Sequence, residues 1–422
     1  MAKKTRKWLR ALVGILSGII ALLCVLFIPL RIYAALADAP PSNKPDRIGE
    51  ADFLQTDGKD IVNRSGERVY LRGTNAGAWL IQERWQCPTN ALDQSTARQV
   101  LAERFGEKKR DELFAVYESN YWQSSDFDNC AAMGMSVLRL PFPWWELTDE
   151  DGAEKPGAFT RMDWFVESCA ERGIYVILDL HAAYGSQNGE QHSGLKSDGR
   201  GLYGSEENRA KTLRLWEMVA EHYAGNPAVA AYDLLNEPDN DSGFTRKEQW
   251  DYYDELYRAV RAVDSEHIIM LESCWFRINI PNPEKYEWEN VVYEYHQYAR
   301  PVKNSALGIQ LFSEFYALEI LSGFYDVPVF IGEFTCFAQP EAWEFTLRLF
   351  NSLGWHWATW SYKCTGVGDS AWGIYNQDLP KADIYLDSEE AIRAIWSRTG
   401  TEASCVTRTQ YADIIQKFLQ DE

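Results

Sequence analysis

Two stretches, Ala231-Tyr-Asp-Leu-Leu-Asn-Glu-Pro238 and Val327-Pro-Val-Phe-Ile-Gly-Glu-Phe334, decide how this chain folds. Each is a short, mostly apolar run that leads into a glutamate, Glu237 in the first and Glu333 in the second. Strands of a parallel barrel have this pattern, because they are buried on both faces and deliver polar groups at their carboxyl ends. The two stretches therefore predict two barrel strands whose glutamates, 96 residues apart in sequence, meet at one end of the fold.

Eight apolar runs of strand length occur along the chain, separated by longer segments with a helical pattern. The runs are residues 69–75, 136–140, 175–181, 229–236, 267–272, 291–296, 329–333 and 356–361. The helical patterns include residues 97–118, 163–172, 207–223, 247–263 and 341–353. This alternation predicts an α/β fold, a (β/α)8 TIM barrel. A doubly wound open sheet is the competing architecture, but no glycine-rich turn links an early strand to a helix.

The amino terminus has the pattern of a membrane or export segment. Residues 1–10 carry five basic side chains, and residues 11–30 carry no charge. Twenty uncharged residues are enough for a helix to cross a bilayer, and the basic flank places the amino terminus inside the cell. Ala35-Leu36-Ala37 is a candidate cleavage site, so a removed export signal is the alternative. Both alternatives export the rest of the chain.

Three parts are expected along the chain. Residues 1–31 form a cytoplasmic basic tip and the transmembrane or signal helix, residues 32–50 a polar, Pro-rich tether, and residues 51–422 one barrel domain. The expected location is the cell membrane with the barrel outside, on a single-pass anchor. If the amino-terminal segment is cleaved, the barrel is secreted instead.

The charge of the body restricts its partners. The chain has a net charge of −20, and residues 32–422 hold 36 basic and 62 acidic side chains, or −26. A body this acidic repels nucleic acid and favours neutral ligands such as uncharged polysaccharides. The 17 Trp and 22 Tyr suggest a surface that stacks against flat ligands, although a large aromatic core would also account for them.

Metal and cofactor motifs are missing from the sequence. The eight cysteines include no Cys-x-x-Cys pair, so neither a zinc site nor a disulfide scaffold is indicated. There is also no His-Glu-x-x-His motif and no serine nucleophile elbow. We therefore expect a site that works without a metal or a cofactor.

Polar or aromatic residues stand in or directly after the predicted strands. In strand order they are Asn75, Arg139, His181, Asn236, Glu237, Glu272, His296, Tyr298, Glu333 and Trp360. The carboxyl ends of barrel strands meet at one face, so these side chains are expected to form one site. Two carboxylates in such a site suit glycosidic-bond cleavage, in which one protonates the leaving oxygen and the other attacks the sugar. A single glutamate after a strand usually lies next to the cap of the following helix and has no catalytic role. Only the whole set of polar residues favours a catalytic site.

At these positions the sequence resembles glycoside hydrolase family 5, the cellulase-like retaining barrels. The matching motifs are Arg139-Leu-Pro-Phe142, Leu178-Asp-Leu-His181, Leu235-Asn-Glu-Pro238, His296-Gln-Tyr298, Ile331-Gly-Glu-Phe334 and Trp360-Ser-Tyr362. The resemblance implies that Glu237 is the acid/base and Glu333 the nucleophile. It also implies that the first sugar subsite is lined by Arg139, His181, Asn236, His296, Tyr298 and Trp360.

Each role makes a physical demand on the surroundings. Glu333 has to attack as a carboxylate, and Arg139 is the candidate to keep it charged. Glu237 has to begin protonated, so we expect aromatic closure and the second carboxylate to raise its pKa. Tyr298 can donate to the nucleophile, and His296 can hold either glutamate, although a buried structural pair would look the same. For a retaining mechanism the carboxyl groups are expected roughly 5–5.5 Å apart.

The loop from His181 to Gly194 carries the best indication of substrate. Its Gln187, Asn188 and His192 offer hydrogen bonds that suit sugar hydroxyls, and its glycines allow it to turn back over the cleft. The loop resembles that of the exo-1,3-glucanase-like members, which implies a β-glucan, but it departs from them at Ala183-Tyr184. A purely structural Ω-loop is the alternative.

Aromatic side chains near strand ends are candidates for stacking on sugar rings. Trp360 is expected to form the floor of the subsite before the cleaved bond, with Trp144 and Tyr184 as further substrate contacts. Other aromatic candidates are Trp145, Trp275, Phe337 and Trp372. Each of them could equally belong to the core.

Taken together, the residues predict an exported retaining β-glycosidase acting on a neutral carbohydrate. A β-mannanase or other β-hexosidase is the alternative within the enzymes. A non-catalytic glycan-binding surface protein and a structural membrane protein are alternatives of other classes. Intact Glu237 and Glu333 argue against a binding protein, which has no need for two charged groups in a dry cleft.

Overall fold

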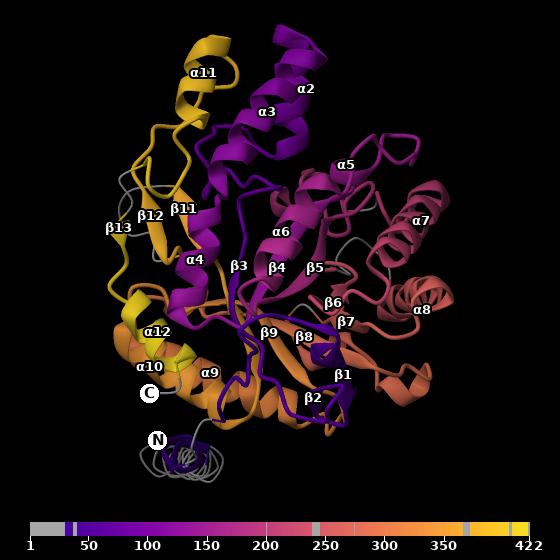
Figure 1. Cartoon of the computed structure of the whole chain (residues 1–422), viewed down its shortest axis with the longest axis vertical. Helices are drawn as coiled ribbons and strands as arrows, with labels where there is room; N and C mark the ends of the chain where they lie inside the picture. The colour runs from indigo at the N-terminus through magenta and orange to yellow at the C-terminus, as the bar shows by residue number, and fades with distance from the viewer. Residues whose placement is uncertain are drawn as a thin grey trace, which may run out of the picture.

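The computed structural model describes residues 30–36, 40–199, 201–238, 245–273, 275–365, 372–404 and 407–420. These residues contain a closed barrel of eight parallel strands in the order β10-β3-β4-β5-β6-β7-β8-β9 (Figure 1). The strands are β3 (Arg72–Asn75), β4 (Val137–Pro143), β5 (Tyr175–Ala182), β6 (Val229–Asp233), β7 (Ile268–Glu272), β8 (Val291–Tyr298), β9 (Val329–Thr335) and β10 (His356–Thr359). The predicted (β/α)8 barrel is confirmed, and each of the eight apolar runs contains a strand.

The register between neighbouring strands brings polar residues to one level of the barrel. Asn75 on β3 lies opposite Arg139 on β4. A shift in register after Tyr295 on β8 places His296 opposite Glu333 on β9. Because both faces of these strands are buried, the residues at this level form a polar layer directly above an apolar core.

The outer layer of the barrel consists of helices. They are α4 (Ser124–Met133), α6 (Thr160–Ala170), α7 (Glu206–Tyr223), α8 (Arg246–Val263), α9 (Ala306–Leu321) and α10 (Pro340–Ser352). In α8 the buried residues Tyr252, Leu256 and Val260 are spaced four apart, so they share the face that packs on the sheet. This helix begins at Thr245, whose side chain forms a capping box with Glu248.

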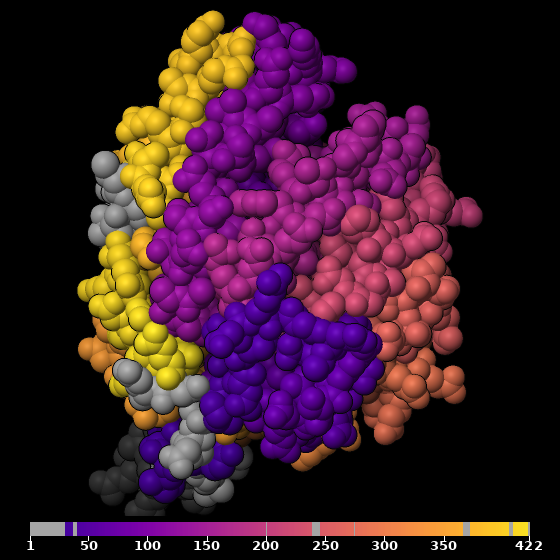
Figure 2. All heavy atoms as spheres, viewed as in Figure 1, coloured from indigo at the N-terminus to yellow at the C-terminus, as the bar shows by residue number. Residues whose placement is uncertain are grey.

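Extra elements extend the barrel at the end where α2 (Gln94–Phe105) and α3 (Glu107–Tyr121) stand. The single helix expected over residues 97–118 is in fact these two helices, which are separated by Gly106 with φ of 88°. The helix α11 (Glu389–Trp396) packs beside α3, and the three helices form one projection from the molecule (Figures 1 and 2). An ion pair between Lys109 and Glu389 joins them.

Smaller elements complete the described fold. They are the helices α5 (Trp144–Leu147) and α12 (Ala412–Leu419), the hairpin of β1 (Leu54–Asp57) and β2 (Asp60–Asn63), and a sheet of β11 (Lys363–Thr365), β12 (Tyr375–Gln377) and β13 (Thr407–Arg408). Short 3-10 helices lie at Glu50–Asp52, Gln191–Ser193, Arg277–Asn279, Pro283–Lys285 and Arg300–Val302. The described cysteines 87, 130, 169 and 336 are buried thiols.

Most of the predicted membrane segment, residues 11–29, lies outside the described part of the chain. Within the described part, no helix is both long enough and apolar enough to cross a bilayer. Residues 30–36 are helical and pack on the barrel, where Arg31 Nη2 donates to Glu314 Oε2 on α9 at 2.8 Å. Ser42 and Lys44 also bind barrel backbone. Residues 32–50 were expected to form a polar, Pro-rich tether, which stays a prediction; the described residues of this segment make these contacts with the barrel.

Candidate active site

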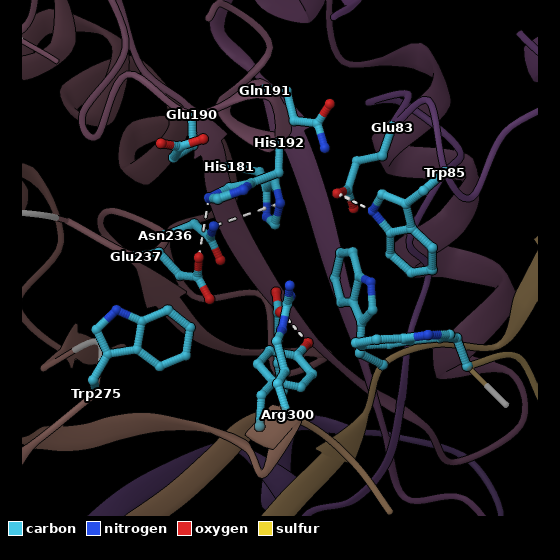
Figure 3. A pocket seen from close by; sticks show the side chains of 14 residues that line it. Glu83, Trp85, His181, Glu190, Gln191, His192, Asn236, Glu237, Trp275 and Arg300 are labelled. Carbon is cyan, nitrogen blue, oxygen red and sulfur yellow. Dashed lines mark hydrogen bonds and ion pairs between the residues drawn. The ribbon is translucent and has the colours of Figure 1, made fainter. Parts of the chain in front are cut away.

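The two glutamates singled out in the sequence line the same cavity of about 650 Å³. Figure 3 shows the cavity with Glu237 at its wall. One carboxylate oxygen of Glu237, one of Glu333 and a ring nitrogen of His296 are all within 4.8 Å of one another. Glu237 is 7% exposed and Glu333 5% exposed, and both line the cavity. The fold therefore presents two carboxylates to one space at a separation that fits a single sugar carbon between them.

Local backbone geometry fixes each glutamate. Glu237 lies four residues beyond the end of β6 at Asp233 and has φ of 43°, a left-handed conformation that non-glycine residues rarely adopt. Its backbone N–H donates to the carboxylate of Glu272 at the end of β7, which stabilises this conformation. Glu333 lies within β9 after Gly332, where an added Cβ would be 1.5 Å from Glu294 Oε1. Only glycine at position 332 leaves room for Glu294 beneath the site.

Both carboxylate oxygens of Glu333 are held by donors. Arg139 Nη1 donates to Oε1 at 3.1 Å, and the Tyr298 hydroxyl donates to Oε2 at 2.7 Å. Arg139 is fully buried and also pairs with Asp179 at 3.0 Å and with Asp233 at 2.7 Å. Burial alone would lower the pKa of Arg139, but Asp179, Glu294 and Asp233 raise it well above its usual value. A permanent cation thus fixes the direction of the Glu333 carboxylate.

Glu237 is held by two histidines instead. His296 Nδ1 lies 2.8 Å from Oε1, and His192 Nε2 lies 3.0 Å from Oε2. Burial acts to raise the pKa of Glu237, but His192 and His296 outweigh it and lower the pKa well below its usual range. The expectation of a raised pKa was wrong. The sequence showed the aromatic closure and the second carboxylate, but it did not show that two imidazole rings reach this side chain.

His296 is the cation between the two glutamates. Besides Glu237, it approaches Glu272 at 3.5 Å, Glu294 at 3.4 Å and Glu333 at 3.5 Å. Burial opposes its charge, but Glu272 and Glu333, together with its hydrogen bonds to Glu237 and Glu294, raise the pKa of His296 well above its usual value. A charged imidazole here offsets part of the repulsion between carboxylates in the cavity.

Other residues implied by the family resemblance gather around this centre. His181 stacks on Trp360 with ring centroids 5.4 Å apart, and its Nδ1 lies 2.7 Å from Asp179 Oδ2. Asn236 Oδ1 accepts from Arg139 Nη2 at 2.9 Å. His181, Asn236, Tyr298 and Trp360 line the cavity, whereas Arg139 and His296 hold the carboxylates from below its wall.

Besides Arg139 and His296, four more residues predicted to bind substrate are not among those that line the cavity. Trp144 and Tyr184 stack on each other with centroids 4.2 Å apart. The side-chain amide of Gln187 is buried and donates to the carbonyl oxygens of His181 and Asn236, both at 2.8 Å. Asn188 donates to the carbonyl oxygen of Glu237 at 3.0 Å. Trp144 packs against Tyr184 of the loop, and Gln187 and Asn188 bind backbone near the end of β6. All four side chains therefore support the loop. Of the other aromatic candidates, Trp275 and Trp372 line the cavity, and Trp145 and Phe337 are not among its lining residues.

Several cavity residues were not predicted as site residues. They are Glu83, Trp85, Glu190, Gln191 and Arg300, whereas His192, which also lines the cavity, was expected to contact sugar hydroxyls. Glu83 and Trp85 lie on the long connection from β3 to α2, away from any strand end, so the strand pattern gave no indication of them. Trp85 Nε1 donates to Glu83 Oε2 at 2.6 Å, and burial raises the pKa of Glu83 to about 7. Figure 3 shows both residues on the opposite side of the cavity from Trp275.

Glu237, His296 and Glu333 are the group of described residues whose ligand atoms lie close enough to share a cation. The two glutamates already have other protein partners, namely His192 for Glu237, and Arg139 and Tyr298 for Glu333. This pairing suits a nucleophile and a proton donor better than a set of metal ligands. The expectation that the site needs no metal or cofactor stays a prediction.

Proteins of known sequence resemble this chain over part of their length. A β-xylosidase of Phanerodontia chrysosporium is 31% identical over 252 residues, which are 58% of this chain and 52% of that protein. A probable glucan 1,3-β-glucosidase A of Aspergillus clavatus is 28% identical over 275 residues, 64% of this chain and 63% of that protein. The chain therefore spans between about half and two thirds of these curated relatives.

Solved structures resemble the fold. A rutinosidase from Aspergillus niger superposes with a TM-score of 0.57 and 17% identity, covering 78% of this chain and 98% of that chain. An endo-glycoceramidase II from Rhodococcus sp. gives 0.56 and 19%, covering 78% and 79%. The family described as "Cellulase (glycosyl hydrolase family 5)" matches residues 105–366, which include Arg139, Glu237 and Glu333. The chain belongs to glycosyl hydrolase family 5.

Proposed function

We propose that this protein hydrolyses β-glycosidic bonds with retention of configuration, through a covalent intermediate on Glu333. The observation that carries the proposal is the separation of the two carboxylates, whose nearer oxygens lie within 4.8 Å. Retaining enzymes hold the pair roughly 5–5.5 Å apart, whereas inverting enzymes need about 6.5–9.5 Å to admit a water molecule. The short spacing supports direct attack on the sugar.

In the first step, Glu333 attacks the anomeric carbon. Arg139 and Tyr298 hold its two oxygens, so the attacking carboxylate cannot rotate away. A bond forms between the carbon and a Glu333 oxygen, and the bond to the leaving oxygen breaks with its electron pair. Glu237 supplies the proton that the leaving oxygen takes up.

In the second step, Glu237 acts as the base. It takes a proton from water, the water oxygen attacks the anomeric carbon, and the bond to Glu333 breaks. The two inversions restore the original configuration, and Glu237 regains the proton that it lost. His296 lies against both glutamates, so its charge is available in both steps.

The substrate that we propose is a neutral β-glucan or an oligosaccharide of that type. Trp360, Trp275 and Trp372 line the cavity and offer faces on which sugar rings can stack. The acidic balance of residues 32–422 disfavours anionic polymers. The names of the two relatives, a β-xylosidase and a glucan 1,3-β-glucosidase, support β-linked neutral sugars.

The experiment is a panel of purified β-glucans, mannans and xylans with product analysis, alongside aryl β-glucosides, β-mannosides and β-xylosides. We expect the highest kcat/KM on a β-glucan or β-glucoside. A preference for mannosides or xylosides would replace the proposed sugar but keep the mechanism. Carbohydrate binding without hydrolysis of any member would contradict the enzymatic proposal.

We also propose that residues 11–30 anchor the barrel to a membrane, with the barrel outside the cell. The support comes from their twenty uncharged residues and from the helix that Arg31, the next residue, contacts. That helix is α9, whose outer face exposes Leu307 by 59%, Leu311 by 43% and Phe315 by 51%. No lysine or arginine occurs in α9 to compete with an apolar environment. The full chain should float with liposomes at high salt, and recovery of a shortened, soluble chain from culture medium would indicate cleavage instead.

A further inference from the structure

His192 is the unexpected neighbour of the acid/base. It belongs to the loop after β5 that was expected to bind sugar hydroxyls, yet its Nε2 lies 3.0 Å from Glu237 Oε2 (Figure 3). Its side chain is 23% exposed and lines the cavity. Glu237 therefore has His296 on one oxygen and His192 on the other.

The loop that carries His192 is built to hold it in this place. Asn188 donates to the carbonyl oxygen of Glu237 at 3.0 Å and so ties the loop to the acid/base itself. The backbone N–H of Glu190 donates to Asn188 Oδ1 at 2.8 Å, which fixes the orientation of the amide. The hydroxyls of Ser186 and Ser193 close the loop through a hydrogen bond. Because of these bonds, His192 is fixed in position relative to Glu237.

The hydrogen bonds leave room for one proton between the two side chains. Asn188 Nδ2, a donor, lies 2.9 Å from His192 Nε2, the same nitrogen that faces Glu237. If Nε2 carries the proton, it donates to the Glu237 carboxylate, and Asn188 Nδ2, itself a donor, makes no hydrogen bond to it. If Nε2 is bare, its single lone pair accepts either from a protonated Glu237 or from Asn188. The 3.0 Å contact between His192 and Glu237 fits a proton on either side chain.

Titratable groups from five other elements face this pair. Glu83 on the β3–α2 connection and Glu333 on β9 act on His192, and His181 on β5 lies with its ring 6.3 Å away. Burial disfavours a charged His192, but Glu237, Glu83 and Glu333 raise its pKa to about 9. His296 on β8 and Glu272 on β7 face Glu237 from the other side. On its own loop, Glu190 is paired with Lys196.

We propose that His192 is a positioning residue that shares one proton with Glu237 and thereby sets the upper pH limit of acid catalysis. This inference rests on the proposed function, because it concerns the proton that the hydrolysis needs. Nothing in the family resemblance assigned such a role to this loop. The loop was expected to contact the sugar, and here it contacts the acid/base.

The proton balance of the cycle follows from this pairing. In the free enzyme the pair holds one proton, mainly on His192. As the glycosidic bond breaks, that proton moves from Nε2 to Glu237 and from Glu237 to the leaving oxygen, so the pair is left with none. In the second step Glu237 takes a proton from the attacking water, and the pair again holds one. Two coupled groups titrate together, so activity falls when the pair, not Glu237 alone, loses its proton.

The test compares His192→Gln with the wild type across pH. Glutamine can still hydrogen-bond to Glu237 but cannot carry the proton, and His296 would continue to lower the pKa of Glu237. For aryl β-glycosides with poor leaving groups, we expect the alkaline limb of kcat/KM to move down by about one pH unit or more. For a dinitrophenyl glycoside, whose departure needs no proton, kcat/KM should change little.

The matched control is His222→Gln. His222 also pairs with an acid, Asp163, at 2.8 Å, but it lies on α7 and is not among the cavity residues. Its substitution should leave the alkaline limb where it is. An unmoved alkaline limb in His192→Gln, or equal losses with both kinds of leaving group, would overturn the proposal and make His192 a sugar-binding or structural residue.

A second measurement needs neither activity nor a substitution at His192. In nitrogen-15 histidine NMR of the wild type, one cavity histidine should titrate near pH 9, and Glu237→Gln should lower that midpoint by about one unit or more. An unchanged midpoint would contradict the shared proton. This measurement requires no turnover. If the protein hydrolysed no substrate, the proposed function would be contradicted, but the shared proton of His192 and Glu237 could still be tested.

Discussion

The carboxyl ends of β6 and β9 present the same chemical group, a glutamate carboxylate, to the same cavity, yet different side chains bind it at each end. At the end of β9, Glu333 is bound by an arginine and a tyrosine. At the end of β6, Glu237 is bound by two histidines and has a left-handed backbone conformation. Arginine stays charged at every working pH, whereas histidine exchanges its proton near neutrality.

The difference shows how one cavity can separate two roles. A nucleophile needs a fixed negative charge and a fixed direction, which a permanent cation and a hydroxyl donor provide. A group that gives and takes protons needs neighbours that can do the same. The roles of Glu237 and Glu333 are therefore set by their partners, which come from strands and loops far away in sequence.

The largest effect is expected from Glu333→Ala. Loss of the attacking carboxylate should reduce hydrolysis of aryl β-glycosides by about 10⁴-fold or more, with no loss of folding. Steady-state kinetics and a thermal melt check both parts. Added azide should restore turnover by attacking the exposed anomeric carbon and giving a glycosyl azide of inverted configuration. Near wild-type hydrolysis in this variant would contradict the role of Glu333 as the nucleophile.

The next largest effect is expected from Glu237→Gln, and it should depend on the leaving group. Substrates that need protonation should lose about 10²- to 10⁴-fold in kcat/KM, because general acid catalysis contributes that much. Dinitrophenyl glycosides should lose far less in the same parameter. If both kinds of substrate lose activity equally, Glu237 is not the proton donor and the contrast with Glu333 fails.

A smaller effect is expected when one donor to the nucleophile is removed. Tyr298→Phe eliminates the 2.7 Å hydrogen bond to Glu333 and keeps the ring that lies near Trp275 and Trp372. A hydrogen bond to a charged group contributes about 1.5–3 kcal/mol, so kcat/KM should fall by about 10- to 100-fold. An unchanged rate would mean that Arg139 alone orients Glu333.

The smallest effect is expected at Trp144, which was predicted to bind substrate but is not among the cavity residues. Trp144→Ala should leave KM within about twofold of the wild type while lowering the melting temperature, because the side chain packs against Tyr184. Trp85→Ala is the matched variant, since Trp85 lines the cavity and should raise KM. A large rise in KM for the Trp144 variant would place substrate beyond the described cavity.

The barrel could be predicted because its signal is local. Each strand is a short apolar run that contains a polar residue within it, as with Arg139, His181 and Glu333. Periodicity within a few residues is enough to recognise such elements. The meeting of Glu237 and Glu333 in one cavity was predicted for the same reason, since the first lies shortly after a strand and the second within one.

The surroundings of Glu237 could not be predicted in this way. His192 reaches it from a loop whose path depends on internal hydrogen bonds such as that between Ser186 and Ser193. Glu83 enters the cavity from a connection with no periodic pattern. Loop conformation depends on many weak, non-local contacts, so residue types alone suggested sugar contacts where the structure has contacts to the acid/base.

Gln187 illustrates the same limit. As a polar residue in a glycine-containing loop, it looked suited to sugar hydroxyls, but its amide is buried and bound to three backbone groups. A buried amide has to satisfy its hydrogen bonds within the protein, and here the backbone does so. Whether a polar side chain faces a ligand or its own chain is decided by the fold of the loop.

The most direct test of the account is the configuration of the first product. Proton NMR during hydrolysis of an aryl β-glycoside reports the anomer that the enzyme releases before mutarotation. Carboxylates within 4.8 Å of each other predict that the β-anomer appears first. Initial release of the α-anomer would mean a single displacement by water, and it would contradict the role of Glu333 as the nucleophile.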